Sequence, residues 1–191
     1  PEYRTSNGGI WQPGDVIQAA IGQSDNAFTP LQLATYCATI ANNGTRLKTH
    51  LVKQVTNYNR DQVISETEPE VVAQVDISEE NLKTVQEAMK GVTQSGGTAN
   101  SVFGDYGITI AAKTGTAENP GHSDNVTFIA YAPYDDPEIA VAVVLEYGSR
   151  GTYSMNVAKD IFDAYFYGKT VDENGNLVMP EETNSSSTAN E

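Results

Sequence analysis

The fold is decided at residues 107–118, which read Gly107-Ile108-Thr109-Ile110-Ala111-Ala112-Lys113-Thr114-Gly115-Thr116-Ala117-Glu118. Apolar and polar side chains alternate from Ile108 to Lys113, a period of two that predicts a β-strand. Lys113 supplies a cation, and the hydroxyl groups of Thr114 and Thr116 can bind a carboxylate. Gly115 leaves the backbone bare between them, so an extended peptide can lie against the strand.

The same local pattern also fits a strand that approaches a hairpin and carries an exposed lysine, because Lys-Thr-Gly is short and common in turns. Residues 107–118 alone leave both interpretations open. The order of the other motifs along the chain is what separates them.

Length and composition describe a globular protein. The chain has 191 residues, with 39% hydrophobic and 19% charged residues, enough for one domain or a large part of a bigger one. No apolar run approaches the ~20 residues that a membrane-spanning helix needs. The opening residues Pro1-Glu2-Tyr3-Arg4 show no signal peptide and read as sequence from the middle of a protein.

Charge and the metal-binding residue types exclude several classes of function. Lys and Arg total 11 and Asp and Glu total 25, so the net charge is 11 − 25 = −14. No nucleic-acid partner is expected, since phosphate binding needs basic patches. Cys37 is the single cysteine and lies in an apolar helical pattern, which predicts a buried side chain. His50 and His122 are far apart, so neither a metal site nor a cofactor is expected.

The N-terminal part of the chain predicts one clear helix. Residues 1–14 read as a loop anchored by Trp11, and residues 15–21 as a short apolar segment. A helix begins at Thr29-Pro30, because threonine can cap the first turn and proline needs no backbone N–H there. Asn42-Asn43-Gly44 ends this helix with a left-handed stop.

The middle of the chain predicts strands followed by a second helix. Residues 49–75 are rich in β-branched side chains, with a hairpin turn at residues 57–61. Ser78 begins the second helix, which ends at residues 95–98. A loop is expected over residues 99–106.

The C-terminal part completes an antiparallel sheet. Strands are predicted at residues 126–131 and 139–147, joined by a short turn. Ser154 is expected to cap a last helix, and residues 168–191 lose all periodicity and predict an acidic, disordered tail. Helices packed on an antiparallel sheet without βαβ alternation give an α+β class. The domain is therefore expected to cover residues 1–167.

Several short motifs stand in one order along the chain. Together they closely resemble the C-terminal part of the transpeptidase domain of penicillin-binding proteins, and most of all the class B enzymes of the cell-elongation type, over about residues 11–167. The motifs are Trp11-Gln12-Pro13-Gly14-Asp15, Ala20-Ile21-Gly22-Gln23, Thr29-Pro30-Leu31-Gln32-Leu33-Ala34, Ile40-Ala41-Asn42-Asn43-Gly44, Gly97-Thr98-Ala99, Lys113-Thr114-Gly115-Thr116-Ala117-Glu118, Phe128-Ile129-Ala130-Tyr131-Ala132-Pro133 and Pro137-Glu138-Ile139-Ala140-Val141-Ala142-Val143.

Only one of the three signatures of that family is present in the family's order. They are Ser-x-x-Lys, Ser-x-Asn and Lys-Thr-Gly, and no serine of the chain has a lysine three positions on. The form Ser-Asp-Asn of the second signature occurs twice, at Ser24-Asp25-Asn26 and Ser123-Asp124-Asn125, but both stand out of the family's order. We therefore expect the nucleophilic serine and its lysine to lie upstream, in a segment that this chain lacks.

The resemblance implies a serine-type D,D-transpeptidase that cross-links peptidoglycan by acyl transfer and is a target of β-lactams. It implies that Lys113 acts in the proton and electrostatic network of the site and that Thr114 and Thr116 bind the donor carboxylate. The N–H of Thr116 would form half of the oxyanion hole, and Gly115 would let the donor approach. The implied partners are peptidoglycan stem peptides, β-lactams and the upstream half of the domain.

The resemblance also places the activity outside the cytoplasmic membrane, where the family is anchored through an N-terminal segment that is absent here. The competing interpretation is a non-catalytic scaffold or sensor with a penicillin-binding fold, because the nucleophile is missing from this chain. An acidic surface module unrelated to cell walls would require every motif match to be a coincidence.

Overall fold

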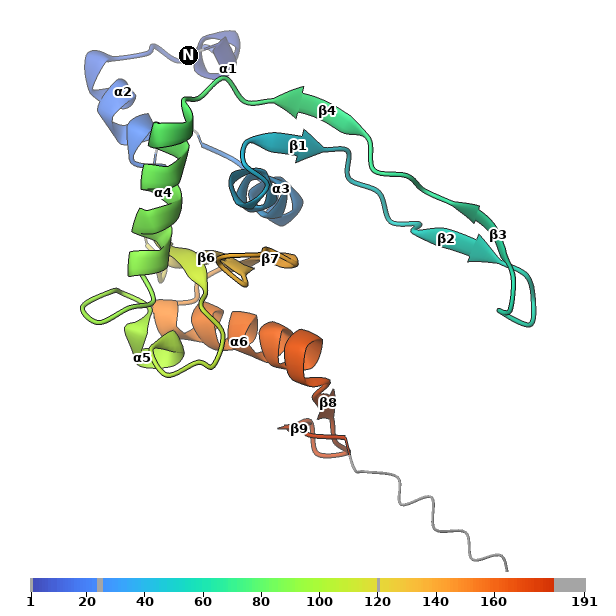
Figure 1. Cartoon of the computed structure of the whole chain (residues 1–191). Coiled ribbons are helices and arrows are strands. Elements are labelled where there is room, and N and C mark those ends of the chain that lie inside the picture. The colour runs from blue at the N-terminus through green and yellow to red at the C-terminus, as the bar shows by residue number, and fades with distance from the viewer. Residues whose placement is uncertain (1, 24–25, 120, 181–191) are drawn as a thin grey trace, which may run out of the picture.

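The computed structural model describes residues 2–23, 26–119 and 121–180. Within them the protein has the predicted α+β class, with a three-stranded antiparallel sheet between helices on both faces (Figure 1). The strand order in this sheet is β5-β6-β7. These strands are β5 (Ala111–Ala117), β6 (Asn125–Ala132) and β7 (Ile139–Leu145).

Helix α6 (Gly151–Tyr167) and the short helix α5 (Asn100–Phe103) cover one face of the sheet. The core on this face is aromatic. Phe103 stacks on Phe128 with ring centroids 5.6 Å apart and meets Phe162 edge to face at 6.2 Å. Both arrangements are favourable for aromatic pairs, so α5, β6 and α6 are held together at one point.

Helices α3 (Pro30–Ala41) and α4 (Glu79–Gly91) cover the opposite face. Cys37 is fully buried there against Tyr131 and Ile129 of β6, which confirms the predicted burial. Both helices begin where the capping residues predict. The hydroxyl of Thr29 accepts the N–H of Gln32, and the hydroxyl of Ser78 accepts the N–H of Asn81.

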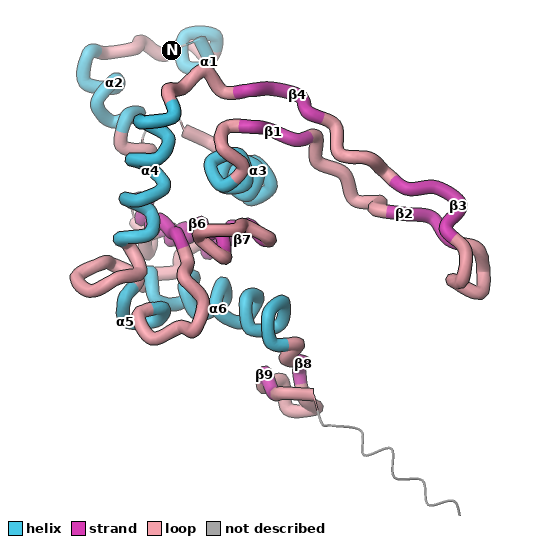
Figure 2. The backbone as a smooth tube through the Cα atoms, in the orientation of Figure 1, coloured by secondary structure: helices cyan, strands magenta, loops and turns pink. Residues whose placement is uncertain are grey.

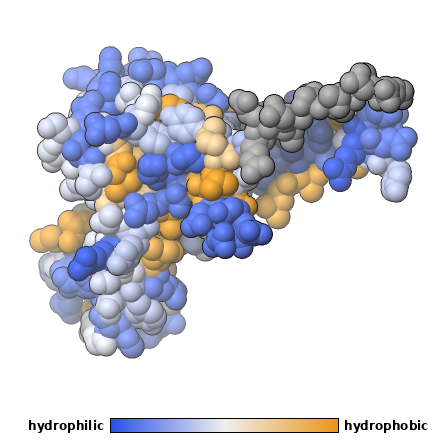
Figure 3. Space-filling model, turned by 90° about the horizontal axis from the view of Figure 1, so that it is seen from below, coloured by the Kyte–Doolittle hydropathy of each residue, from blue (hydrophilic) through white to orange (hydrophobic). Residues whose placement is uncertain are grey.

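Four short strands form a two-stranded arm that projects away from the sheet (Figures 1 and 2). Strand β1 (Thr45–Leu47) pairs with β4 (Val71–Gln74), and β2 (Gln54–Thr56) pairs with β3 (Val63–Glu66). The predicted hairpin turn lies between β2 and β3. Isolated two-stranded ribbons are marginally stable in water. Hydrophobic side chains are exposed along the arm (Figure 3).

The N-terminal region is more helical than predicted. It forms α1 (Glu2–Ser6) and α2 (Pro13–Ala20) instead of a loop and a short apolar segment. Proline fits the first position of α2, and the backbone N–H of Gln12 donates to Asp15 at 2.7 Å. No residue of α2 is buried, and Ile17 is 70% exposed. The apolar side of α2 therefore has no cover among the described residues.

Several boundaries differ from the prediction. Helix α4 ends at Gly91 and not at residues 95–98, and β7 ends at Leu145 and not at residue 147. The central strand begins at Ala111 and not at residue 107. Just before it, the carbonyl of Thr109 accepts the N–H of Tyr134 at 2.8 Å and the carbonyl of Ile110 accepts the hydroxyl of Thr93 at 2.7 Å. Within the predicted loop at 99–106, α5 forms one helical turn. Ser154 is not the cap of α6, which begins at Gly151; the serine hydroxyl is buried and donates to the carbonyl of Gly151.

The segment after α6 is not wholly irregular. Gly168 ends the helix in a left-handed conformation, with φ of 66°. Strands β8 (Thr170–Val171) and β9 (Leu177–Val178) then pair as a small hairpin, which the sequence did not predict. The remainder of the predicted tail, residues 181–191, lies outside the described residues. None of the helices in the described ranges has the length and apolarity to cross a membrane.

Candidate active site

The Lys-Thr-Gly segment occupies an edge strand. Strand β6 pairs with one side of β5, and the register places Lys113 opposite Ile129 and Gly115 opposite Thr127. In the part of the chain that the structure describes, no strand pairs with the other side of β5. This edge can therefore bind an extended peptide through its backbone N–H and C=O groups, of which the carbonyl of Thr114 already accepts a hydrogen bond from Nζ of Lys113.

The side chains of β5 alternate between the two faces of the sheet. Ala111 packs with Cys37 and Ile129 in the core under α3 and α4, and Ala112 packs with Phe128 in the core under α6. By this alternation Lys113 and Gly115 lie on the α3 side, and Thr114 and Thr116 lie on the α6 side. A ligand along the free edge of β5 thus meets a cation from one face and hydroxyl groups from the other.

The ammonium group of Lys113 has no counter-ion among the described residues. Its side chain is exposed, and its Nζ donates to the backbone carbonyl of Thr114. The ion pairs of the described residues involve other lysines. A cation without a carboxylate partner at an open strand edge can attract a ligand carboxylate.

The two threonines differ in their surroundings. Thr114 is half-buried, and its hydroxyl lies 3.1 Å from the hydroxyl of Thr98, where either group can be the donor. Thr116 is exposed and lies two residues further along the same face. The contact from Thr98 was not predicted, because that residue is 16 positions away in the sequence.

The glycine of this segment is not required by the described fold. Gly115 does not have a positive φ, and an added Cβ would lie 3.5 Å from the Cβ of Thr127, an ordinary van der Waals distance. Alanine would therefore fit at this position in the described residues. The space that glycine leaves next to Lys113 remains open to a ligand.

The loop after β5 is fastened to the segment that follows β7. The backbone N–H of Tyr147 donates to the side chain of Asn125 at 2.9 Å, and that of Ser149 donates to the carbonyl of Asp124 at 3.2 Å. Ser123 is exposed in this loop. Ser24, the other serine of a Ser-Asp-Asn match, lies outside the described residues.

The remaining candidates for a nucleophile or a metal site are the thiol of Cys37 and clusters of metal-ligating side chains, and the structure supports neither of them. Burial raises the pKa of the Cys37 thiol to about 12, so the reactive thiolate is scarce at neutral pH. Among the residues that the structure describes, no group of three or more His, Cys, Asp or Glu side chains could hold a metal ion.

The sequence of this domain matches a known family. The model of the penicillin-binding protein transpeptidase domain matches residues 2–166. The chain belongs to this family. It corresponds to part of the transpeptidase domain of class B penicillin-binding proteins.

Two relatives of this penicillin-binding transpeptidase chain illustrate the similarity in sequence. Penicillin-binding protein 2A of Bacillus subtilis is 37% identical over 172 residues, which cover 80% of this chain and 24% of the relative. Penicillin-binding protein 2B of Streptococcus pneumoniae is 35% identical over 162 residues, covering 78% and 24%. The chain therefore spans about a quarter of the length of the curated relatives it matches.

Solved structures show the same transpeptidase fold. The structure of penicillin-binding protein 2B from S. pneumoniae gives a TM-score of 0.70 at 33% identity and covers 82% of this chain and 27% of that one. An imipenem acyl-enzyme complex of penicillin-binding protein A from M. tuberculosis gives 0.67 at 30% identity, covering 78% and 33%. These matches place the sheet and helices described above within a transpeptidase domain.

Proposed function

We propose that this chain forms the Lys-Thr-Gly wall of a serine-type D,D-transpeptidase that cross-links peptidoglycan. The observation that supports this most strongly is the free edge of β5. It carries an exposed cation at Lys113, which has no carboxylate partner among the described residues, and a glycine at position 115 that the described fold does not require.

The donor substrate is a stem peptide that ends in D-Ala-D-Ala and lies along the free edge of β5. Lys113 attracts its terminal carboxylate, and the hydroxyl groups of Thr114 and Thr116 donate hydrogen bonds to it. The N–H of Thr116 forms half of the oxyanion hole for the scissile carbonyl. Gly115 lets the donor approach the backbone.

The nucleophilic serine comes from the upstream half of the domain, which carries Ser-x-x-Lys and Ser-x-Asn. Its Oγ attacks the carbonyl of the penultimate D-Ala, the peptide bond breaks, and the serine proton passes to the departing amine of the last D-Ala. An amine of a neighbouring stem peptide then attacks the serine ester. A new amide forms, and the serine regains its proton. Lys113 assists these proton transfers.

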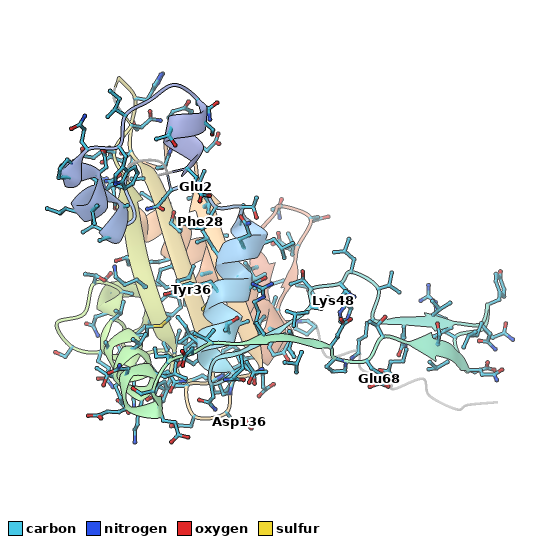
Figure 4. The ribbon with its side chains drawn as sticks, turned by 90° about the horizontal axis from the view of Figure 1, so that it is seen from above. Glu2, Phe28, Tyr36, Lys48, Glu68 and Asp136 are labelled. Atoms are coloured by element: carbon cyan, nitrogen blue, oxygen red, sulfur yellow. The ribbon has the colours of Figure 1, made fainter. Side chains whose placement is uncertain are left out.

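The upstream half has an uncovered apolar surface available to it. Phe28 and Tyr36 are each about 60% exposed, and Figure 4 shows Tyr36 on α3 and Lys48 at the base of the arm. A groove between these elements is lined largely by apolar side chains, including Leu31, Leu47 and Val72. Contiguous exposed apolar surface of this kind usually marks an interface, and we assign it to the rest of the transpeptidase domain.

The ligands and location follow from the same function. β-Lactams mimic the donor and acylate the serine; the M. tuberculosis relative above is an imipenem acyl-enzyme complex. Peptidoglycan is cross-linked outside the cell, so the domain works at the extracytoplasmic face of the membrane and is held there by an N-terminal anchor. Its role is in cell-wall synthesis and cell shape, where altered β-lactam binding would confer resistance.

The test is mass spectrometry of the intact protein that carries this chain, with and without a β-lactam. A mass increase on a peptide upstream of this chain supports the proposal. An increase on Ser24 or Ser123 would contradict the assignment of the nucleophile to the upstream half. Absence of any adduct would instead favour the non-catalytic scaffold or sensor.

A further inference from the structure

The loop between α4 and α5 brings a second threonine to the Lys-Thr-Gly strand. The hydroxyl of Thr98 lies 3.1 Å from that of Thr114, and Thr98 is exposed at the surface of the described residues. This is a contact between a loop and the middle of β5, on the face of the sheet where Thr114 and Thr116 lie.

Glycine and alanine on either side of Thr98 fix the position of this loop. A Cβ on Gly97 would lie 2.2 Å from the carbonyl oxygen of Val92, so only glycine fits without rearrangement. The N–H of Ala99 donates to the same carbonyl at 2.9 Å, and the Ala99 side chain is fully buried in the core. Thr98 is thus held between two anchored neighbours.

The same loop is also fastened to the chain just before β5. The buried hydroxyl of Thr93 donates to the carbonyl of Ile110 at 2.7 Å, and the side chain of Asn100 donates to the carbonyl of Thr93 at 3.1 Å. The loop and the start of β5 therefore share one frame. The hydroxyl groups of Thr98 and Thr114 meet because the backbone on both sides is fixed.

We propose that Thr98 is a positioning residue. Its hydroxyl donates a hydrogen bond to the hydroxyl oxygen of Thr114 and so directs the single hydroxyl proton of Thr114 toward the donor carboxylate. This inference rests on the proposed function. A hydroxyl group has one proton, whereas an ionised carboxylate only accepts. Because hydrogen bonds to a charged acceptor are stronger than neutral ones, a bound carboxylate selects the arrangement in which Thr114 donates to it and accepts from Thr98.

The hydrogen bond from Thr98 is expected to strengthen the binding of the donor carboxylate by Thr114. Two hydrogen bonds in a row polarise each other, so the outer bond to the carboxylate is strengthened by the inner bond from Thr98. Removal of the Thr98 hydroxyl leaves Thr114 able to bind, but with its proton free to rotate. We expect a loss of about three- to tenfold in acylation, the range for one neutral hydrogen bond.

The experiment compares acylation of the intact enzyme by a penicillin and by the methyl ester of the same penicillin. Thr98→Val removes the hydroxyl at almost constant volume and is expected to slow acylation by the free acid three- to tenfold while leaving acylation by the ester unchanged. Thr98→Ser restores the hydroxyl and the rate. Thr84→Val is the matched control, since Thr84 is an exposed threonine of α4 whose hydroxyl donates to the carbonyl of Glu80.

A double-mutant cycle separates positioning from direct binding. In the Thr114→Val background, Thr98→Val should cause no further loss, because the group that it orients is gone. Should Thr98→Val lower the thermal unfolding midpoint, Thr98→Ala provides the same loss of hydroxyl with a smaller side chain.

The outcomes distinguish this inference from the proposed function. If the wild-type protein is not acylated by the penicillin, the proposed function fails and the role of Thr98 fails with it. If the wild-type protein is acylated, three results overturn the positioning role alone: an unchanged rate for Thr98→Val, an equal loss for acid and ester, or additive losses with Thr114→Val.

Discussion

The hydroxyl of Tyr106 donates a 2.8 Å hydrogen bond to the carboxylate of Asp163, a side chain 57 positions later in the sequence. Asp163 is only 2% exposed, and its other carboxylate oxygen accepts from Lys159 and Lys169, each at 2.8 Å. One buried anion therefore joins the loop before β5, the helix α6 and the segment that follows it.

Asp163→Asn should lower the free energy of unfolding of the intact protein by about 2–4 kcal/mol, because it leaves two lysines without their buried partner. The measurement is urea unfolding. Asp160→Asn is the matched control, since Asp160 is an exposed aspartate on the same helix and its substitution should change stability by less than about 0.5 kcal/mol. Equal stability of the two variants would show that the network contributes nothing.

The same residue predicts a dependence of stability on pH. Burial alone would raise the pKa of Asp163, but hydrogen bonds from Lys159, Lys169 and Tyr106 outweigh it and lower the pKa below its usual range. The folded-state pKa is below the unfolded-state value of about 4. The stabilisation of the fold by the ionised Asp163 is therefore complete above the unfolded-state pKa, and it is lost as the pH falls through the folded-state pKa. The Asp163→Asn variant should therefore lose less stability than the wild type between pH 5 and pH 2 in urea unfolding.

Lys113→Ala in the intact protein should slow β-lactam acylation at least about 10²-fold, because the site loses the cation that attracts the carboxylate and assists proton transfer. The fold should be unchanged, since Lys113 is exposed and forms no ion pair with the described residues. Acylation is followed with a fluorescent penicillin. The Lys53→Ala variant, at an exposed lysine of the arm, should be acylated at the wild-type rate. Acylation of Lys113→Ala at the wild-type rate would refute the role assigned to Lys113.

Gly115→Val tests whether the donor peptide binds along the free edge of β5. The added side chain begins 3.5 Å from Thr127, so the protein should fold, while the branched group obstructs a ligand that lies along the strand. We expect saturable β-lactam binding to be lost at an unchanged thermal unfolding midpoint. Gly91→Ala is the control, because a Cβ there meets nothing within 4 Å. Normal antibiotic binding by Gly115→Val would show that the donor lies elsewhere.

Much of the secondary structure followed from residues close together in the sequence. Thr29 and Ser78 cap their helices through N–H groups three positions away, so the capping residues alone predicted where α3 and α4 begin. The alternation around Lys113 predicted a strand, and the ordered motifs indicated the family that the comparisons identify. The roles of Lys113, Thr114, Gly115 and Thr116 stay predictions.

The sequence by itself determined the caps of α3 and α4, the Lys-Thr-Gly strand, the family and the absence of a Ser-x-x-Lys motif from this chain. Only the tertiary structure decided that β5 lies at an edge of its sheet, that Thr98 meets Thr114, and that Tyr106 reaches Asp163. The physical reason is the separation in sequence between the groups that make contact. A cap is satisfied within one helical turn, whereas these contacts close long stretches of chain and form only because the packed core brings their ends together.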